Sequence, residues 1–116
     1  MVFDARFLAN PFWEEALRDK TGLDPEVAEF FMKEQDFSLW IDQLVPMLDW
    51  YLPKYHQARG AFPRIAVGCT GGRHRSVFVV EHLNNILSEK GFAVDRLHRD
   101  ITVSYTHLTL PTNREG

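Results

Sequence analysis

The sequence predicts an α/β fold with a small, mainly parallel sheet flanked by helices. Three observations lead to this fold class. Short apolar segments with the composition of strands alternate with longer segments whose apolar residues recur at helical spacing. Strands that alternate with helices favour βαβ units and parallel pairing. The third observation is the loop of residues 68–76, whose glycines and basic residues between a strand and a helix are typical of a phosphate-binding strand–loop–helix.

The first element is a strand at residues 2–8, where apolar and polar residues alternate. Asp4 and Arg6 lie on the same face of this strand. They are expected either to pair with each other at the sheet edge or to contact a ligand. Asn10-Pro11 ends the strand, because proline cannot donate to a ladder.

Two short helical segments follow. Residues 12–17 are expected to form a helical turn. Asp24-Pro25 then marks a helix start, because aspartate is a favoured N-cap and proline fits the first helical position. This helix is expected to run to about Lys33.

A long amphipathic helix is predicted at residues 37–56, with apolar residues along one broad face. Pro46 and Pro53 lie inside it, and each removes a hydrogen bond, so a kink or two abutting helices is expected. Residues 57–61 form a loop. Residues 62–67 are apolar enough for a central parallel strand.

The last third of the predicted domain is a helix and a strand. The helix covers residues 76–90 and stops at Gly91, and the third strand covers residues 92–98. Strand, helix and strand in this order predict a βαβ unit with a right-handed crossover. A ligand is then expected at the carboxyl ends of the strands, where the loop lies.

Length and composition limit the class of protein. The chain of 116 residues has the size of one domain. Residues 1–101 are expected to form it, and residues 102–116 a tail of non-native origin or poor packing. No segment resembles a membrane span or a signal peptide, and a single cysteine fits a reducing cytoplasm. The five histidines have no paired ligand spacing, so neither a metal nor another cofactor is expected.

Charge is unevenly distributed along the chain. The formal net charge is −3, yet no Asp or Glu occurs from Trp50 to Val80, where the basic residues of the loop lie. A basic stretch in an acidic protein favours a phosphorylated ligand.

The loop allows three interpretations. It can bind an anion through glycine-rich backbone, helix N-terminus and arginine. It can be catalytic, because Cys69, five residues, Arg75 and Ser76 match the Cys-x5-Arg-Ser signature of cysteine-dependent phosphatases. It can also be a purely structural turn. Against catalysis, Gly68 replaces the histidine that usually precedes the cysteine, and no acid loop of the Trp-Pro-Asp type is evident.

The sequence also predicts where the aromatic and histidine side chains outside the loop lie. Trp13, Trp40 and Trp50 are expected in the core, because each lies beside other apolar residues. His82 is expected on the surface. His98-Arg99 follows the third predicted strand, which favours a place in the ligand pocket.

Several motifs occur in an order that is specific to one family. They are Phe3-Asp4-Ala-Arg6-Phe-Leu-Ala-Asn10-Pro11-Phe-Trp13, Leu17-Arg18, Thr21-Gly22-Leu23-Asp24, the loop Gly68-Cys-Thr-Gly-Gly-Arg-His-Arg-Ser76-Val, and His98-Arg99-Asp100. Through them residues 2–101 resemble the C-terminal domain of the RNase adapter protein RapZ family.

The resemblance implies a non-catalytic module. Family members join a nucleotide-binding domain to this C-terminal domain, form homo-oligomers, bind a small regulatory RNA and present it to RNase E. They also sense glucosamine-6-phosphate, a phosphorylated amino sugar. The pocket residues that the resemblance implies are Asp4, Arg18, Thr21, Cys69, Thr70, Gly71, Gly72, His74, Arg75 and Ser76.

Two features depart from the family's pattern. This chain has no Walker A motif, and residues 102–116 hold one arginine where enterobacterial members have a basic cluster for RNA. RNA contacts are therefore expected from basic residues elsewhere. These candidates are Lys54, Arg59, Arg64, Arg73, Arg96 and Arg99.

Overall fold

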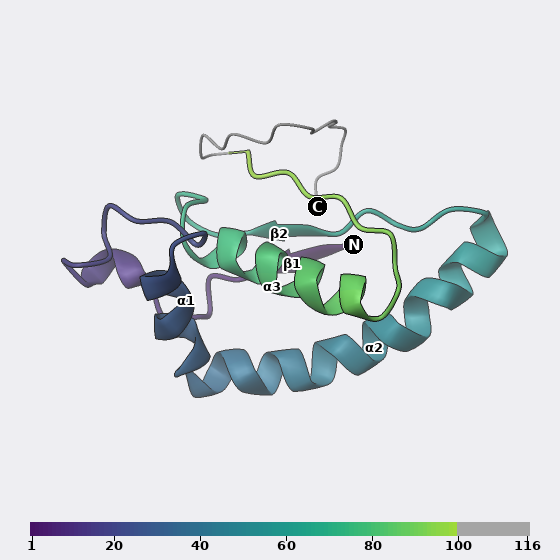
Figure 1. The fold of residues 1–116 in the computed structure, drawn as a ribbon, viewed down its shortest axis with the longest axis horizontal. Coiled ribbons are helices and arrows are strands. Elements are labelled where there is room, and N and C mark those ends of the chain that lie inside the picture. Colours follow the sequence, from purple (N-terminus) through teal and green to yellow (C-terminus); the bar gives the residue numbers. More distant parts are fainter. Residues whose placement is uncertain (100–116) are drawn as a thin grey trace.

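The computed structural model describes residues 1–99 and has the predicted α/β architecture (Figure 1). A two-stranded parallel sheet packs with three helices and one short 3-10 helix. In chain order the elements are β1 (Val2–Asp4), η1 (Pro11–Trp13), α1 (Pro25–Met32), α2 (Gln35–Arg59), β2 (Ala66–Gly68) and α3 (Arg75–Glu89). The predicted tail, residues 102–116, lies outside the described residues.

The sheet brings the first and the middle part of the chain together. β1 and β2 pair in parallel, with Val2 opposite Ala66 and Asp4 opposite Gly68. The crossover between them contains α1 and α2. Because both strands end at the same edge, Asp4 and the loop after Gly68 lie side by side.

Both strands are shorter than the sequence predicts. β1 ends at Asp4 because its carboxylate accepts a hydrogen bond from the Arg6 N–H at 2.9 Å, and the Leu8 N–H donates to the Ala5 carbonyl at 3.1 Å. β2 begins at Ala66, after Pro63, which has no N–H to donate to a ladder.

The predicted third strand at residues 92–98 is wrong. This segment has no regular secondary structure, and in the described part of the chain the sheet has two strands. Phe92 and Val94 pack against the core while Asp95 is exposed, so the alternation of the sequence is satisfied by packing alone. The βαβ unit expected across α3 is therefore replaced by the crossover that joins β1 to β2.

α2 is a single helix of 25 residues that contains both Pro46 and Pro53 (Figure 1). Figure 1 shows that α2 bends along its length, which agrees with the predicted kink. The alternative of two abutting helices is wrong, because α2 is one continuous helix. It also continues three residues beyond the predicted end. Gly60 closes it with φ 78°, and the Gly60 N–H donates to the His56 carbonyl at 2.8 Å.

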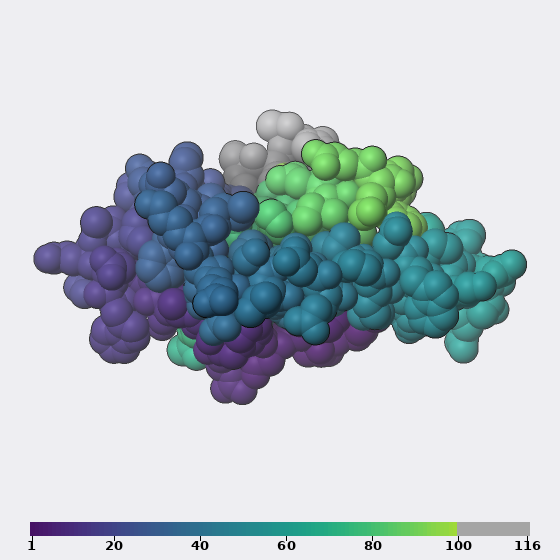
Figure 2. All heavy atoms as spheres, turned by 90° about the horizontal axis from the view of Figure 1, so that it is seen from below, coloured from purple at the N-terminus to yellow at the C-terminus, as the bar shows by residue number. Residues whose placement is uncertain are grey.

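The hydrophobic core lies where the three helices meet the sheet. Figure 2 shows the atoms of α2 running along the long axis of the molecule. Phe31 of α1 stacks on Phe78 of α3 with ring centroids 5.0 Å apart, and Phe37 of α2 contacts both rings. His82 packs against Phe37 and Phe78, and burial lowers its pKa. The prediction of a surface position for His82 is therefore wrong.

The tryptophans differ from the expectation in two of three cases. Trp13 is 74% exposed and Trp50 is 62% exposed, whereas Trp40 is half-buried against Phe3 and Phe7. The buried residues of α2 follow helical spacing at residues 37, 41, 44, 48 and 52, and residue 50 falls off this stripe.

Candidate functional site

The loop that joins β2 to α3 has the backbone of an anion site. Gly71 and Gly72 adopt positive φ values of 81° and 64°, which side-chain-bearing residues rarely do. α3 then begins at Arg75. It has no acidic residue in its first turn, and the His74 side chain makes no cap hydrogen bond. The positive end of a helix of 15 residues therefore has no side-chain anion of its own.

Cys69 fastens the two ends of the loop to each other. The Ser76 N–H donates to the Cys69 Sγ at 3.2 Å, and the Cys69 thiol lies 3.2 Å from the Ser76 hydroxyl oxygen. The sulfur therefore accepts a hydrogen bond from one of the N–H groups at the start of α3 that have no partner within the helix. The Cys69 side chain is half-buried.

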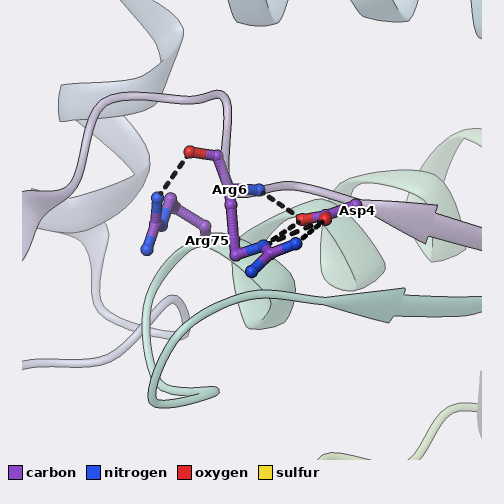
Figure 3. Close-up of polar contacts among 3 residues, drawn as sticks. All are labelled: Asp4, Arg6 and Arg75. Atoms are coloured by element: carbon purple, nitrogen blue, oxygen red, sulfur yellow. Dashed lines mark hydrogen bonds and ion pairs between the residues drawn. The ribbon is translucent and has the colours of Figure 1, made fainter.

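The basic side chains of the loop reach toward residues 6–19. Arg75 Nη1 donates to the Arg6 carbonyl at 2.9 Å, as Figure 3 shows, and to the Leu8 carbonyl at 3.2 Å. His74 Nε2 lies 3.0 Å from the Leu17 carbonyl, and Arg73 Nη2 donates to the Asp19 carbonyl at 3.2 Å. Arg75 is buried, and within residues 1–99 its Nε has no hydrogen-bond partner.

These carbonyl partners are absent from the sequence-based site. Backbone groups have no residue-type signal, so the composition of residues 6–19 does not reveal that they receive the loop. The one available signal is Gly22, whose N–H donates to the Arg73 carbonyl at 2.8 Å. A glycine in a turn indicates a close approach of backbone.

Asp4 and Arg6 pair with each other, which is one of the two alternatives open from the sequence (Figure 3). Asp4 Oδ2 lies 2.6 Å from Arg6 Nη2. Hydrogen bonds from the Arg6 side chain and backbone lower the pKa of Asp4 to about 2, with a smaller contribution from the charge of Arg75. Asp4 is therefore ionised at neutral pH and lies at the same sheet edge as the loop.

Arg18 and Thr21 of the expected pocket take part in local contacts. Arg18 Nε donates to the Phe12 carbonyl at 3.0 Å, and its guanidinium carbon lies 5.2 Å from the centre of the Phe12 ring. Thr21 Oγ1 accepts a hydrogen bond from the Leu23 N–H at 3.1 Å. Both residues lie on the connection between η1 and α1.

A cleft of about 250 Å³ opens beside the loop. Gly68, Cys69, Gly72 and Ser76 line it on the loop side, and His98 and Arg99 also line it. No Asp or Glu of the described chain contributes to its lining. His98 and Arg99, for which the sequence favours a place in a ligand pocket, thus line a cleft together with loop residues. Of the other expected pocket residues, Thr70 and Gly71 are exposed on the loop.

A partly buried charge cluster of Glu81, Arg96 and His98 adjoins this cleft, because His98 also lines it. Glu81 Oε2 accepts hydrogen bonds from Arg96 Nε at 2.6 Å and pairs with His98 Nε2 at 2.6 Å. Burial acts to raise the pKa of Glu81, but the hydrogen bonds from His98 and Arg96 outweigh it, so the pKa lies below its ordinary value. Sequence analysis missed Glu81, although it is the single acid in the first two turns of α3.

A larger cleft of about 450 Å³ lies along residues 62–67 and the middle of α3. Its lining is mostly apolar and includes Phe62, Val67 and Leu87. Its polar lining residues are Arg64, Asn84 and Asp95. None of residues 68–76 contributes to it, so its chemistry does not fit the anion that the loop suits.

The sequence as a whole matches a family model described as the RapZ C-terminal domain, over residues 1–102. The chain belongs to this family. It is 44% identical over 102 residues to a protein named "Nucleotide-binding protein" from Novosphingobium aromaticivorans, covering 88% of this chain and 33% of that protein. Similar proteins occur in Rhodospirillum rubrum, 45% identical over 87% of this chain and 32% of the relative, and in Rhodospirillum centenum, 46% identical over 87% and 30%. This chain therefore spans about a third of the length of these relatives.

The basic residues of this RapZ C-terminal domain that were considered for RNA do not form one patch. Lys54 and Arg59 belong to the last turns of α2, and Figure 1 shows that end of α2 at the opposite end of the molecule from the loop. Arg73 and Arg99 are near the loop and exposed, whereas Arg96 is paired with Glu81. Arg64 is exposed and lines the larger cleft.

Residues 1–99 contain no group of three or more His, Cys, Asp or Glu side chains that could hold a metal ion. None of the helices among these residues is both long and apolar enough to cross a membrane.

Proposed function

We propose that this RapZ C-terminal domain binds glucosamine-6-phosphate, a phosphorylated amino sugar, without catalysis. We further propose that it acts as the sensing part of an RNase adapter that presents a small regulatory RNA to RNase E. The observation that carries this proposal is the cleft beside the loop. Its lining combines a helix N-terminus, glycine backbone and the Cys69–Ser76 pair, and it contains no carboxylate in the described chain.

This arrangement suits a phosphate group for two physical reasons. Backbone N–H groups at a helix start point at a bound anion, and the helix dipole favours negative charge there. Gly71 and Gly72 allow the loop backbone to turn toward the ligand, because no Cβ opposes their positive φ. Asp4 lies at the same sheet edge but outside the lining of this cleft, and its ionised carboxylate is paired with Arg6. A contact of Asp4 with the amino group of the sugar would require it to leave Arg6.

Calorimetry with glucosamine-6-phosphate tests the proposal. We expect a dissociation constant between about 1 µM and 1 mM, which corresponds to roughly −8 to −4 kcal/mol. Gly71→Ala is expected to weaken binding about tenfold, because alanine disfavours φ 81° and shifts the loop backbone. Gly60→Ala is the matched control: Gly60 has φ 78°, and in both positions an added Cβ meets nothing within 4 Å. It lies at the end of α2, so binding should be unchanged.

Absence of heat at millimolar ligand would contradict the sugar-phosphate proposal. Equal loss of binding in Gly71→Ala and Gly60→Ala would mean that strain, and not the loop, causes the effect. The RNA part is tested on the same protein by gel shift, with and without saturating glucosamine-6-phosphate. An unchanged RNA affinity would contradict the coupling of sensing to RNA.

The second candidate function, a cysteine-dependent phosphatase, is favoured only by the Cys69–Arg75 spacing. We expect no hydrolysis of para-nitrophenyl phosphate above the rate of the Cys69→Ser variant. The physical reason is that the Cys69 Sγ already accepts a hydrogen bond from the Ser76 N–H within the loop. A missing general acid would slow only esters with an alkoxide leaving group, by about 10²–10⁴-fold, whereas para-nitrophenolate leaves without such help, so this assay tests the thiol itself. Moreover, Arg75 already donates to two carbonyls. Turnover that disappears in Cys69→Ser would establish the phosphatase instead.

A further inference from the structure

The imidazole of His98 lines the cleft and is also hydrogen-bonded to Glu81. Its side chain is 2% exposed, and its Nε2 lies 2.6 Å from Glu81 Oε2. The same carboxylate oxygen accepts a hydrogen bond from Arg96 Nε at 2.6 Å. His98 also lines the cleft that the loop residues Cys69 and Ser76 line. The ring therefore touches the charge cluster on one side and the proposed ligand site on the other.

The tautomer of a neutral His98 ring follows from its hydrogen-bond partner. The pKa of Glu81 lies below its ordinary value, so at neutral pH its carboxylate is ionised and can only accept hydrogen bonds. His98 Nε2 must then carry the hydrogen. A neutral ring with hydrogen on Nε2 leaves Nδ1 as an acceptor.

The second nitrogen of the His98 ring is Nδ1. Within residues 1–99 it makes no hydrogen bond. The His98 side chain is 2% exposed, and Nδ1 is not one of the fully buried, unpartnered side-chain atoms of that range, which belong to Glu34, Arg75 and Asn84. An acceptor held rigidly in a cleft wall is suited to a ligand group that donates.

We propose that His98 Nδ1 accepts a hydrogen bond from an amino or hydroxyl group of the phosphorylated ligand, and that Glu81 is the positioning residue that holds the ring for it. This inference rests on the proposed function, because it assumes that the phosphate occupies the loop. It assigns specificity for the ligand to the part of the cleft lining that His98 forms. An anion without donors can occupy the loop alone, whereas a sugar phosphate reaches both the loop and His98.

Two substitutions at His98 separate the ligand contact from the structural contact. Glutamine places an amide where Nε2 stands, so His98→Gln keeps a donor for Glu81 and removes the acceptor at Nδ1. Asparagine reaches only the position of Nδ1, so His98→Asn keeps an acceptor there and loses the bond to Glu81. His56→Gln is the control, since His56 is exposed near the end of α2.

The test measures the affinities of each variant for glucosamine-6-phosphate and for sulfate, which has no hydrogen to donate at neutral pH. His98→Gln is expected to weaken glucosamine-6-phosphate binding about three- to tenfold, the effect of one lost hydrogen bond, and to leave sulfate binding and the melting temperature unchanged. His98→Asn should retain more of the affinity than His98→Gln. Glucose-6-phosphate, measured in parallel, distinguishes a hydroxyl donor from an amino donor.

The positioning role of Glu81 has its own readout. Glu81→Ala should lower the ratio of sugar-phosphate affinity to sulfate affinity, and Glu81→Gln should restore it, because glutamine still accepts from Nε2. A variant that weakens both ligands equally shows a structural role only and overturns the assignment. Full sugar-phosphate affinity in His98→Gln overturns it as well. If the unaltered protein binds sulfate but not glucosamine-6-phosphate, the proposed function and this inference both fail.

Discussion

Replacing Gly22 with alanine is expected to lower the free energy of unfolding by about 2–4 kcal/mol, because the new methyl group has no room. An added Cβ would overlap the Phe78 backbone nitrogen, and it would lie 2.6 Å from the His74 carbonyl oxygen. These atoms are the backbone of the start of α3 and cannot rotate away as a side chain does. The turn that contains Gly22 must therefore separate from α3, and its hydrogen bond to the Arg73 carbonyl is lost with it.

Urea unfolding followed by circular dichroism measures this effect. Gly68→Ala is the matched control, because a Cβ at Gly68 meets nothing within 4 Å and its φ lies outside the positive region. The control is expected to stay within about 0.5 kcal/mol of the unaltered protein. Equal unfolding midpoints for Gly22→Ala and Gly68→Ala would show that the turn does not press on α3 as described.

Replacing Arg75 with alanine is expected to destabilise the domain by about 2–4 kcal/mol and to weaken sugar-phosphate binding as well. Arg75 is 5% exposed, and its Nη1 donates to the Arg6 and Leu8 carbonyls. Removing the donor leaves two carbonyls without a partner, each of which costs about 1–3 kcal/mol when it is buried. The loop then loses its anchor to the end of β1, so the geometry of the anion site is lost too.

Unfolding and calorimetry on the same samples separate the two effects of Arg75. Arg73→Ala is the control, because Arg73 is exposed and donates to one carbonyl, that of Asp19. Arg75→Lys should fall between the two, since lysine keeps the charge but lacks the planar fork. A variant Arg75→Ala as stable as Arg73→Ala would contradict the anchoring role. Lost binding with unchanged stability would instead indicate a direct contact of Arg75 with the phosphate.

The fold was predictable where local chemistry decides it. The Asp24-Pro25 start of α1 and the glycine-rich passage from β2 to α3 depend on backbone preferences that the sequence shows directly. Residues 92–98 were not predictable in this way. Alternating side chains report which face is buried, and they say nothing of whether backbone hydrogen bonds to a neighbouring strand exist.

The site was predictable in its loop but not in its surroundings. Cys69 and Ser76 were found from their spacing, and the structure brings them within 3.2 Å. The carbonyls of Leu8 and Leu17 that receive Arg75 and His74 have no side-chain signal at all. Glu81 could not be paired with His98 from the sequence, because only the path of residues 92–98 over α3 brings the two together.

The attachment of three loop side chains to carbonyls of residues 6–19 has a consequence for local unfolding. The loop cannot open without releasing this N-terminal segment, so the two behave as one cooperative unit in the sense used for hydrogen exchange. A ligand that binds only the closed loop raises the free energy of this opening by RT ln(1 + [L]/Kd). Occupancy of the cleft is thereby transmitted to backbone amides near η1 that the ligand never touches.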